Sequence, residues 1–168
     1  MEIAARVALP QDRDAIRQLY EQAMRNHIEI IWGWDQSWQD NDFNNAFQSS
    51  LTYVIESGST LLGYFQIDQN ENYDHLRMLI LKPSARSVGI GAKVLSRILE
   101  ITHDNGKTLL LRVFKSNVNA KRFYEREGWV VLAEEDSFFL MGHSSNSISS
   151  QPGKSSQRTA KSYAFVVR

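Results

Sequence analysis

The amino-acid sequence predicts one domain of the α/β (α+β) class, with 6–7 strands and about four helices. Three observations lead to this fold class. A length of 168 residues gives room for one buried core and leaves little for a second domain. Short β-rich runs recur along the chain. Between several of them, apolar residues repeat with the ~3.6-residue period of an α-helix.

The expected helices are recognised by their apolar period and by the residues at their ends. In the first helix, Ile16, Leu19 and Tyr20 fall on one face. Asn105-Gly106 ends the third helix and Gly128 ends the fourth, because glycine readily adopts the left-handed conformation found after a helix. The helices are expected over residues 11–27, 37–48, 89–103 and 117–127.

The expected strands include a hairpin and a central strand. A short polar turn, Ser57-Gly58-Ser59, joins two β-rich runs and predicts an antiparallel hairpin. The run that ends at Lys82-Pro83 is nearly continuous in apolar residues, which is typical of a strand covered on both faces. The strands are expected over residues 3–9, 51–56, 60–69, 75–81, 108–114, 129–133 and 138–141.

The sequence separates a domain at residues 1–143 from a tail at residues 144–168. Most of the tail is rich in Ser, Gln, Asn, Lys and Arg and contains too little apolar surface to offset the entropy of ordering. We therefore expect a disordered tail. Residues 164–167 leave two alternatives, a docked strand or a frayed end, and the position at a chain terminus favours the frayed end.

Composition excludes several classes of function. Nineteen basic residues balance nineteen acidic ones, so no net charge favours nucleic acid, and we expect no nucleic-acid partner. The chain has no cysteine, which excludes disulfides, thiolate nucleophiles and cysteine-ligated zinc. The four histidines have no helical i, i+3 or i, i+4 spacing, and we expect no metal.

Hydropathy and the N-terminal residues bear on localisation. No apolar run approaches the ~20 residues that a membrane span needs. The first six residues lack the basic start and the apolar stretch of a secretory signal. We expect no membrane partner and a cytoplasmic location.

The segment Arg86-Ser87-Val88-Gly89-Ile90-Gly91 is the most informative part of the sequence. It follows the expected central strand and opens a helix, and its glycines allow close approach to the backbone. Free N–H groups and the positive end of the helix dipole favour an anion such as a pyrophosphate, with Arg86 beside it. Taken alone, the same pattern also fits a plain strand-to-helix turn.

Two ordered motifs carry a family resemblance. Residues 76–95, LRMLILKPSARSVGIGAKVL, resemble motif A of the GNAT N-acetyltransferases, with its R/Q-x-x-G-x-G/A loop. Downstream, the spacing of five residues resembles motif B, N-x-x-A-x-x-x-Y-x-x-x-G-F/W: Asn117, Ala120, Tyr124, Gly128 and Trp129. The resemblance extends over residues 3–141 in element order, and its specific residues lie between 76 and 129.

The resemblance implies a GNAT fold, with a mixed, mostly antiparallel central sheet of 6–7 strands flanked by about four helices. In this fold the fourth and fifth strands splay apart and hold acetyl-CoA. The pantetheine arm would pair with the backbone of the fourth strand, and the pyrophosphate would rest on amides of the glycine loop. The cofactor-binding residues that it implies are Leu79, Ile80, Leu81, Arg86, Ser87, Val88, Gly89, Ile90, Gly91, Asn117, Ala120 and Tyr124.

Tyr124 and His75 are the candidate catalytic residues. A phenol beside the thioester would stabilise charge on the departing sulfur, and a backbone amide near Leu79 would stabilise the carbonyl oxygen. The alternative for Tyr124 is an aromatic ring that only packs. His75 lies about where related histone acetyltransferases carry a glutamate base, and its alternatives are a structural strand-end histidine or a water relay.

The loop between the first two helices borders the acceptor channel in GNAT proteins, which implicates Glu29, Trp32, Trp34 and Asp35. Aromatic faces and carboxylates suit a protonated amine, either a small cationic amine or a peptide amine. Alternatively, the tryptophans pack the second helix on the sheet. By analogy with the family, the final strands could pair in a homodimer.

Other functions stay open. A longer acyl-CoA could replace acetyl-CoA, or the fold could be a catalytically silent CoA-binding regulatory module. A dinucleotide-binding domain fits poorly, because its glycine loop should follow the first strand of the domain.

Overall fold

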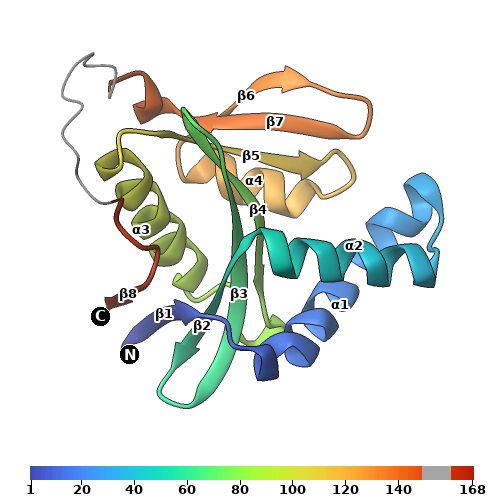
Figure 1. The fold of residues 1–168 in the computed structure, drawn as a ribbon. Helices are drawn as coiled ribbons and strands as arrows, with labels where there is room; N and C mark the ends of the chain where they lie inside the picture. The colour runs from blue at the N-terminus through green and yellow to red at the C-terminus, as the bar shows by residue number, and fades with distance from the viewer. Residues whose placement is uncertain (149–159) are drawn as a thin grey trace.

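In the computed structural model, which describes residues 1–148 and 160–168, one eight-stranded sheet carries helices on both faces (Figure 1). The strands within this part of the chain are β1 (Ile3–Val7), β2 (Leu51–Ser57), β3 (Thr60–Gln69), β4 (Tyr73–Leu81), β5 (Thr108–Phe114), β6 (Trp129–Glu134), β7 (Phe138–His143) and β8 (Phe165–Val167). Their order is β6-β7-β5-β4-β3-β2-β1-β8. Only β4 and β5 are parallel, so the expected mixed, mostly antiparallel sheet is confirmed.

The helices form two layers. They are α1 (Arg13–Trp32), α2 (Gln36–Ser49), α3 (Ile90–Asp104) and α4 (Val118–Arg126), and the described 3₁₀ turns are η1 (Pro10–Asp12), η2 (Pro83–Ala85) and η3 (Ser144–Ile148). In Figure 1, α1 and α2 lie on one side of the sheet and α3 on the other. None of the described helices has the length and apolar character required to cross a membrane.

Alternation along the strands divides the apolar residues into two cores. Phe65 of β3 and Leu111 of β5 point into the core beneath α3 and α4. Tyr64 and Phe114, on the same two strands, point into the core beneath α1 and α2. This period-2 alternation lets one sheet bury both faces, as the nearly continuous apolar strands predict.

The C-terminal residues differ from the sequence expectation. Phe165–Val167 pairs antiparallel with β1 as strand β8, where a frayed end was favoured. Tyr163 is fully buried, and the ring of Phe165 stacks on Phe65 at 6.4 Å. These two aromatic side chains supply enough apolar surface for the end of the chain to dock. An average composition over the whole tail does not reveal them. The expected tail at 149–159 lies outside the described residues.

The strand and helix boundaries differ from expectation by a few residues. Strand β1 ends at Val7, two residues early, because Pro10 opens η1 and the Leu9 N–H donates to the Asp12 carboxylate at 2.7 Å. Strand β4 begins at Tyr73, two residues early, because its first pairs with β5 already form there. Helix α1 continues to Trp32, five residues beyond the expected end at residue 27, and Gly33 follows with φ 78°.

Candidate active site

The parallel strands β4 and β5 part midway along their length. Their pairing runs from Tyr73–Thr108 to Leu76–Leu111 and then stops. Beyond this point, β4 stays paired with β3 as far as Leu81, and β5 stays paired with β7 as far as Phe114. The facing edges of residues 77–81 and 112–114 therefore enclose a gap in the sheet. Backbone N–H and C=O groups along such an edge are available to an extended ligand.

A β-bulge accounts for the separation. Gln66 pairs with Met78 and the next residue of β3, Ile67, pairs with Leu76, so Arg77 is the extra residue on β4. A bulge bends its strand and increases the local twist. The second half of β4 is thereby turned away from β5.

The bulge also fixes which side chains of β4 face each core. Leu79 and Leu81 face the core under α3 and α4, on the side of the glycine loop. Ile80 is buried in the opposite core under α1 and α2. Of the three residues implied to hold the pantetheine arm, Ile80 can therefore offer only its backbone.

The connection from β4 to α3 has two residues in left-handed conformations. Ser87 has φ 62° and Gly89, the N-cap of α3, has φ 84°. No side chain of the described residues caps α3, so the amides of its first turn stay available. Arg86 donates through Nε to the Leu81 carbonyl at 3.0 Å. Val88 is exposed and Ile90 is buried in the core. The loop thus has the open amides and the fixed shape of an anion site.

The start of α3 touches α4 beside the end of β4. A Cβ built on Gly91 would lie 3.3 Å from Cζ of Phe123 and 3.6 Å from a methyl of Leu81. Only a glycine fits this approach without displacing the ring. Motif A and motif B therefore meet at one point of the structure.

The motif B residues are ordered by the start of α4. Asn117 is its N-cap, and the side-chain oxygen accepts from the Ala120 amide at 3.2 Å. This bond satisfies one of the free amides of the helix start. The side chain of Asn117 therefore already has a structural partner within the protein.

Tyr124 lies one turn beyond Ala120 on α4, half-buried among aromatic rings. Its ring centroid is 5.2 Å from that of Phe123 and 6.1 Å from that of Trp129. Burial raises the pKa of Tyr124 to about 12, so the phenol keeps its proton at neutral pH. No described residue accepts a hydrogen bond from its hydroxyl group. Tyr124 is an uncommitted proton donor on the α3–α4 side of the sheet.

His75 lies in the part of β4 that is still paired with β5, opposite Leu110. Its Nδ1 is 3.7 Å from a carboxylate oxygen of Asp68, and its buried Nε2 has no hydrogen-bond partner in the described chain. Burial and the nearby Arg112 guanidinium lower the pKa of His75. The imidazole is therefore neutral at pH 7 and can accept a proton, but it lies before the gap rather than in it.

An aromatic cluster borders the gap on the α1–α2 face. Phe114, the last residue of β5, pairs with Phe138 of β7, and their rings stack at 4.5 Å. Trp32, the last residue of α1, lies 5.9 Å from both rings. His27 stacks on Phe114 at 5.7 Å, and its Nδ1 is 2.8 Å from Ser116 Oγ. The end of α1 thus packs against the end of β5.

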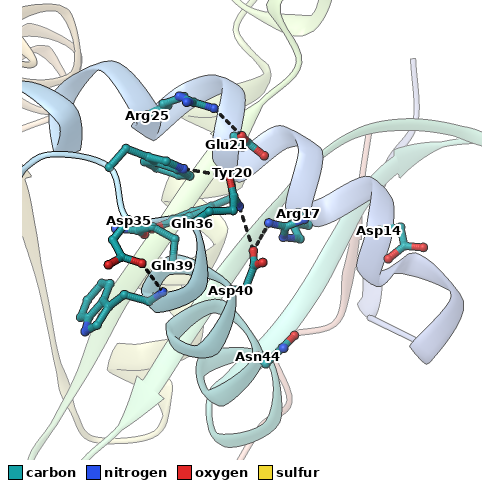
Figure 2. Close-up of polar contacts among 12 residues, drawn as sticks. Asp14, Arg17, Tyr20, Glu21, Arg25, Asp35, Gln36, Gln39, Asp40 and Asn44 are labelled. Carbon is teal, nitrogen blue, oxygen red and sulfur yellow. Dashed lines mark hydrogen bonds and ion pairs between the residues drawn. The ribbon is translucent and has the colours of Figure 1, made fainter.

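The helices α1 and α2 are joined by polar side chains (Figure 2). Arg17 pairs with Asp40, and Tyr20 donates to Gln39 at 2.9 Å. At the connection between the helices, Asp35 is the N-cap of α2 and accepts from the Trp38 amide at 2.9 Å. These contacts fix the orientation of the loop that the sequence implicated in acceptor binding.

The four residues implicated in acceptor binding have different surroundings. Trp34 is half-buried, with the Arg25 guanidinium 5.1 Å above its ring. Asp35 is used as a helix cap. Glu29 and Trp32 are exposed, and of the four only Trp32 makes aromatic contact with the strand ends at the gap.

Unpaired cations and unpaired carboxylates are distributed unevenly over the described residues. Within residues 1–148 and 160–168, five basic residues have no carboxylate partner, and all belong to the β4–α3 segment or to α4: Lys82, Arg86, Lys93, Arg122 and Arg126. In the same residues, five carboxylates have no cationic partner: Glu29, Asp35, Glu71, Glu127 and Asp136. Glu29, Asp35 and Asp136 lie close in sequence to the aromatic cluster, whereas Glu71 lies at the β3–β4 turn and Glu127 directly follows α4. The overall neutrality of the chain conceals the cluster of unpaired cations.

A cavity of about 390 Å³ lies between α1 and the connection that follows β4, where Gln18, Gln22 and Lys82 contribute to its lining. Neither Tyr124 nor His75 lines it. It is therefore a feature of the α1 surface beside the site.

Some residues at the gap could not be identified from the sequence. Phe123 lies next to Tyr124, but its contact with Gly91 depends on how α3 and α4 pack. Phe114 and Phe138 read as ordinary strand residues, and only the sheet order reveals that they are neighbours. The one local signal was that both stand at strand ends, where loops begin.

A parted parallel strand pair, an open-amide glycine loop and an uncommitted phenol fit a CoA-dependent acyltransferase, the class implied by the two motifs. Residues 18–139 match the family model of the acetyltransferase (GNAT) domain. The chain therefore belongs to the GNAT family, and it is an acetyl-CoA-dependent N-acetyltransferase.

Known proteins resemble the chain in sequence and fold. A "5-NmdU N-acetyltransferase" of Pseudomonas phage PaMx11 is 27% identical over 118 residues, which cover 64% of this chain and 83% of the phage protein. PaiA N-acetyltransferase from Thermoplasma acidophilum, solved with coenzyme A, superposes with a TM-score of 0.69 at 19% identity, over 85% of this chain and 99% of the other. Spermidine N-acetyltransferase from Vibrio cholerae, solved with CoA and spermine, superposes with a TM-score of 0.62 at 18% identity, over 83% of this chain and 93% of the other. The solved structures share the fold.

Proposed function

We propose that the protein transfers an acetyl group from acetyl-CoA to a primary amine, by direct attack of the amine in a ternary complex. The observation that carries this proposal is the gap between β4 and β5, with Tyr124 on the α3–α4 face and the Trp32 cluster on the other. Two ligands can approach such a gap from opposite faces of one sheet. No covalent intermediate on the protein is needed, because a neutral amine held in line attacks a thioester directly.

The residues around the gap fit acetyl-CoA. Free edge groups of residues 77–81 would pair with an extended pantetheine arm, since they have no partner on β5, although the Leu81 carbonyl already accepts from Arg86. The loop at Ser87–Gly91 and the unpaired cations beside it, Arg86 and Lys93 among them, would hold the phosphates. When bound, acetyl-CoA supplies the thioester carbon that the amine attacks.

Tyr124 would stabilise the departing thiolate by hydrogen bonding. A phenol with a pKa near 12 is protonated at neutral pH and is a ready donor. Full proton transfer to a thiolate of pKa ~8.5 would be uphill by about 5 kcal/mol. Donation of a hydrogen bond is therefore the proposed role, with solvent completing the protonation.

The amine must lose a proton before it attacks, and His75 is the proposed base. Its lowered pKa favours the neutral form that accepts a proton. Because His75 lies in the paired part of β4, we propose that a water molecule carries the proton from the gap to the unpartnered Nε2. This assignment predicts a role in kcat rather than in acetyl-CoA binding.

The test is release of CoA thiol, measured with DTNB, against amino acids, polyamines, aminoglycosides and short peptides. The protein contains no cysteine and gives no background. Amine-dependent release by the wild type is expected, and Tyr124→Phe should lower kcat by about 10²–10³, as for loss of one preorganised hydrogen-bond donor, with little change in KM for acetyl-CoA.

Phe123→Leu provides a comparison on the same helix, because it changes packing beside the gap without removing a hydroxyl group. Release that no amine stimulates, although acetyl-CoA binds, would rule out small-amine acetylation. Protein acceptors and longer acyl-CoA donors would then be assayed. If no acceptor and no acyl-CoA donor gives thiol release, the protein is a catalytically silent module.

A further inference from the structure

The outer face of Trp32 is uncovered although its inner edge is fixed. The residue is 61% exposed, while its ring contacts Phe114 and Phe138 at 5.9 Å. Among the described residues, no cation lies over this ring. An anchored, uncovered indole at the end of a helix is a preformed surface for a ligand.

The two nearby tryptophans, Trp34 and Trp38, each lack one of the two properties that Trp32 combines. Trp34 has its face covered by Arg25. Trp38 is 59% exposed but has no aromatic partner within the described chain. Only Trp32 combines an uncovered face with contact to the strand ends that form the gap.

Two carboxylates without a cationic partner in the described residues stand close in sequence to Trp32 or to one of its ring contacts. Glu29 lies one helical turn before Trp32, so the two side chains are neighbours on the helix surface. Asp136 stands two residues before Phe138, and neither carboxylate has a cationic partner in the described residues. An indole face with adjacent carboxylates is the arrangement that binds an organic cation.

Binding of the reacting nitrogen itself on this surface would oppose the reaction. Attack on the thioester requires a neutral amine, whereas carboxylates and an indole face stabilise the ammonium form and raise its pKa. The conflict disappears if the bound charge belongs to a second group of the acceptor. That group can stay cationic throughout the reaction.

On the basis of the proposed function, we infer that Trp32 and Glu29 bind the non-reacting positive charge of an acceptor with two cationic groups. Trp32 is then a specificity-determining residue. The acceptor is a diamine or polyamine, or another primary amine with a second fixed cation. Its reacting amine points into the gap between β4 and β5.

The test compares acceptors matched in chain length. Cadaverine, pentylamine and 5-aminopentanol are assayed for thiol release at saturating acetyl-CoA, with phenethylamine as a ring-bearing monoamine. A cation–π contact predicts that kcat/KM for cadaverine exceeds that for pentylamine by about three- to thirtyfold. Trp32→Ala should remove this preference by raising KM for cadaverine, and Trp32→Phe should keep part of it.

Matched variants separate recognition from folding. Trp38→Ala removes a similarly exposed indole that makes no aromatic contact in the described residues, and it should leave the preference unchanged. Glu29→Gln should reduce the preference, whereas Glu71→Gln, at the β3–β4 turn, should not. Thermal unfolding of each variant shows whether the fold is kept.

Three results would overturn the inference. Equal kcat/KM for cadaverine and pentylamine would show that no second charge is recognised. A preference for phenethylamine would assign the indole face to a flat ring. An equal effect of Trp32→Ala on all amines would assign Trp32 to packing. The proposed function survives all three, and fails only if no amine stimulates release.

Discussion

The hydroxyl of Tyr163 donates a 2.6 Å hydrogen bond to the carboxylate of Asp74, 89 residues away in the sequence. Asp74 is on β4, is 0% exposed, and has Lys107 as its second partner at 3.1 Å. Thr102 of α3 also bonds the Tyr163 hydroxyl at 2.6 Å. The C-terminal residues thus complete the polar contacts beneath the strand that forms one edge of the gap.

Tyr163→Phe should therefore destabilise the fold. Without the hydroxyl group, one oxygen of a buried carboxylate loses its partner, and this costs about 1–3 kcal/mol. Urea unfolding measures the loss. Tyr73→Phe is the control, because Tyr73 is exposed at the start of β4 and makes no side-chain hydrogen bond in the described structure. Equal stabilities of the two variants would contradict a structural role for the C-terminal residues.

Gly89→Ala should weaken acetyl-CoA binding as well as the fold. A left-handed conformation at φ 84° costs a residue with a Cβ about 1–2 kcal/mol. Gly106→Ala imposes the same strain at φ 73°, beyond the other end of α3, and neither added Cβ meets a neighbour within 4 Å. Both variants should lose similar stability, but only Gly89→Ala should raise KM for acetyl-CoA. The same KM in both would remove the loop from the cofactor site.

Lys93→Gln should raise KM for acetyl-CoA about two- to tenfold, with a smaller effect at high salt. Lys93 lies in the first turn of α3 and has no carboxylate partner in the described residues. Arg97→Gln is the control, since Arg97 is one turn along the same helix and pairs with Glu100 at 2.6 Å. Steady-state kinetics at two salt concentrations distinguish them. A ratio of the Lys93→Gln KM to the wild-type KM that is the same at both salt concentrations would count against a phosphate contact.

Much of the fold could be predicted from the sequence because its signals are local. The Pro83 stop after an apolar run, the Gly128 helix end and the glycine loop each depend on a few adjacent residues. The strand β8 could not be predicted in this way. Tyr163 and Phe165 are two aromatic residues in a polar segment, and their burial depends on β1 and α3 being in place.

The site was predicted to a lesser extent, for the same reason. Motif spacing led to Gly89, Gly91 and Tyr124, which the structure brings near the gap. It could not reveal the contact of Trp32 with Phe114, which requires α1 to cross the sheet. Nor could it reveal that the Asp35 side chain caps a helix, because α2 begins one residue earlier than expected.

His75 should make stability depend on pH below neutrality. Its pKa is lowered from the ordinary value of 6.5 by burial and by Arg112, so the unfolded chain binds a proton at higher pH than the folded protein does. As pH falls through about 6.5, the free energy of unfolding should decrease, by at most about 1.4 kcal/mol per pH unit for this group. Above that pH, His75 contributes no slope. Urea unfolding of His75→Gln between about pH 5 and 8 should show a flatter profile than wild type. Parallel profiles would contradict the lowered pKa.

Asp35 allows its two roles to be separated by two substitutions. Asp35→Ala removes the acceptor of the Trp38 N–H and should cost about 1 kcal/mol of stability. Asp35→Asn keeps a cap of similar strength and should leave stability within about 0.5 kcal/mol of wild type. Both variants remove one of the unpaired carboxylates near Trp32, and both should raise KM for a cationic acceptor about two- to threefold through weakened charge attraction. Urea unfolding and acceptor kinetics measure the two effects independently. If Asp35→Asn keeps the wild-type KM, the Asp35 carboxylate acts only as the N-cap of α2. Glu29 and Asp136 are then the remaining carboxylates that could attract a cationic acceptor.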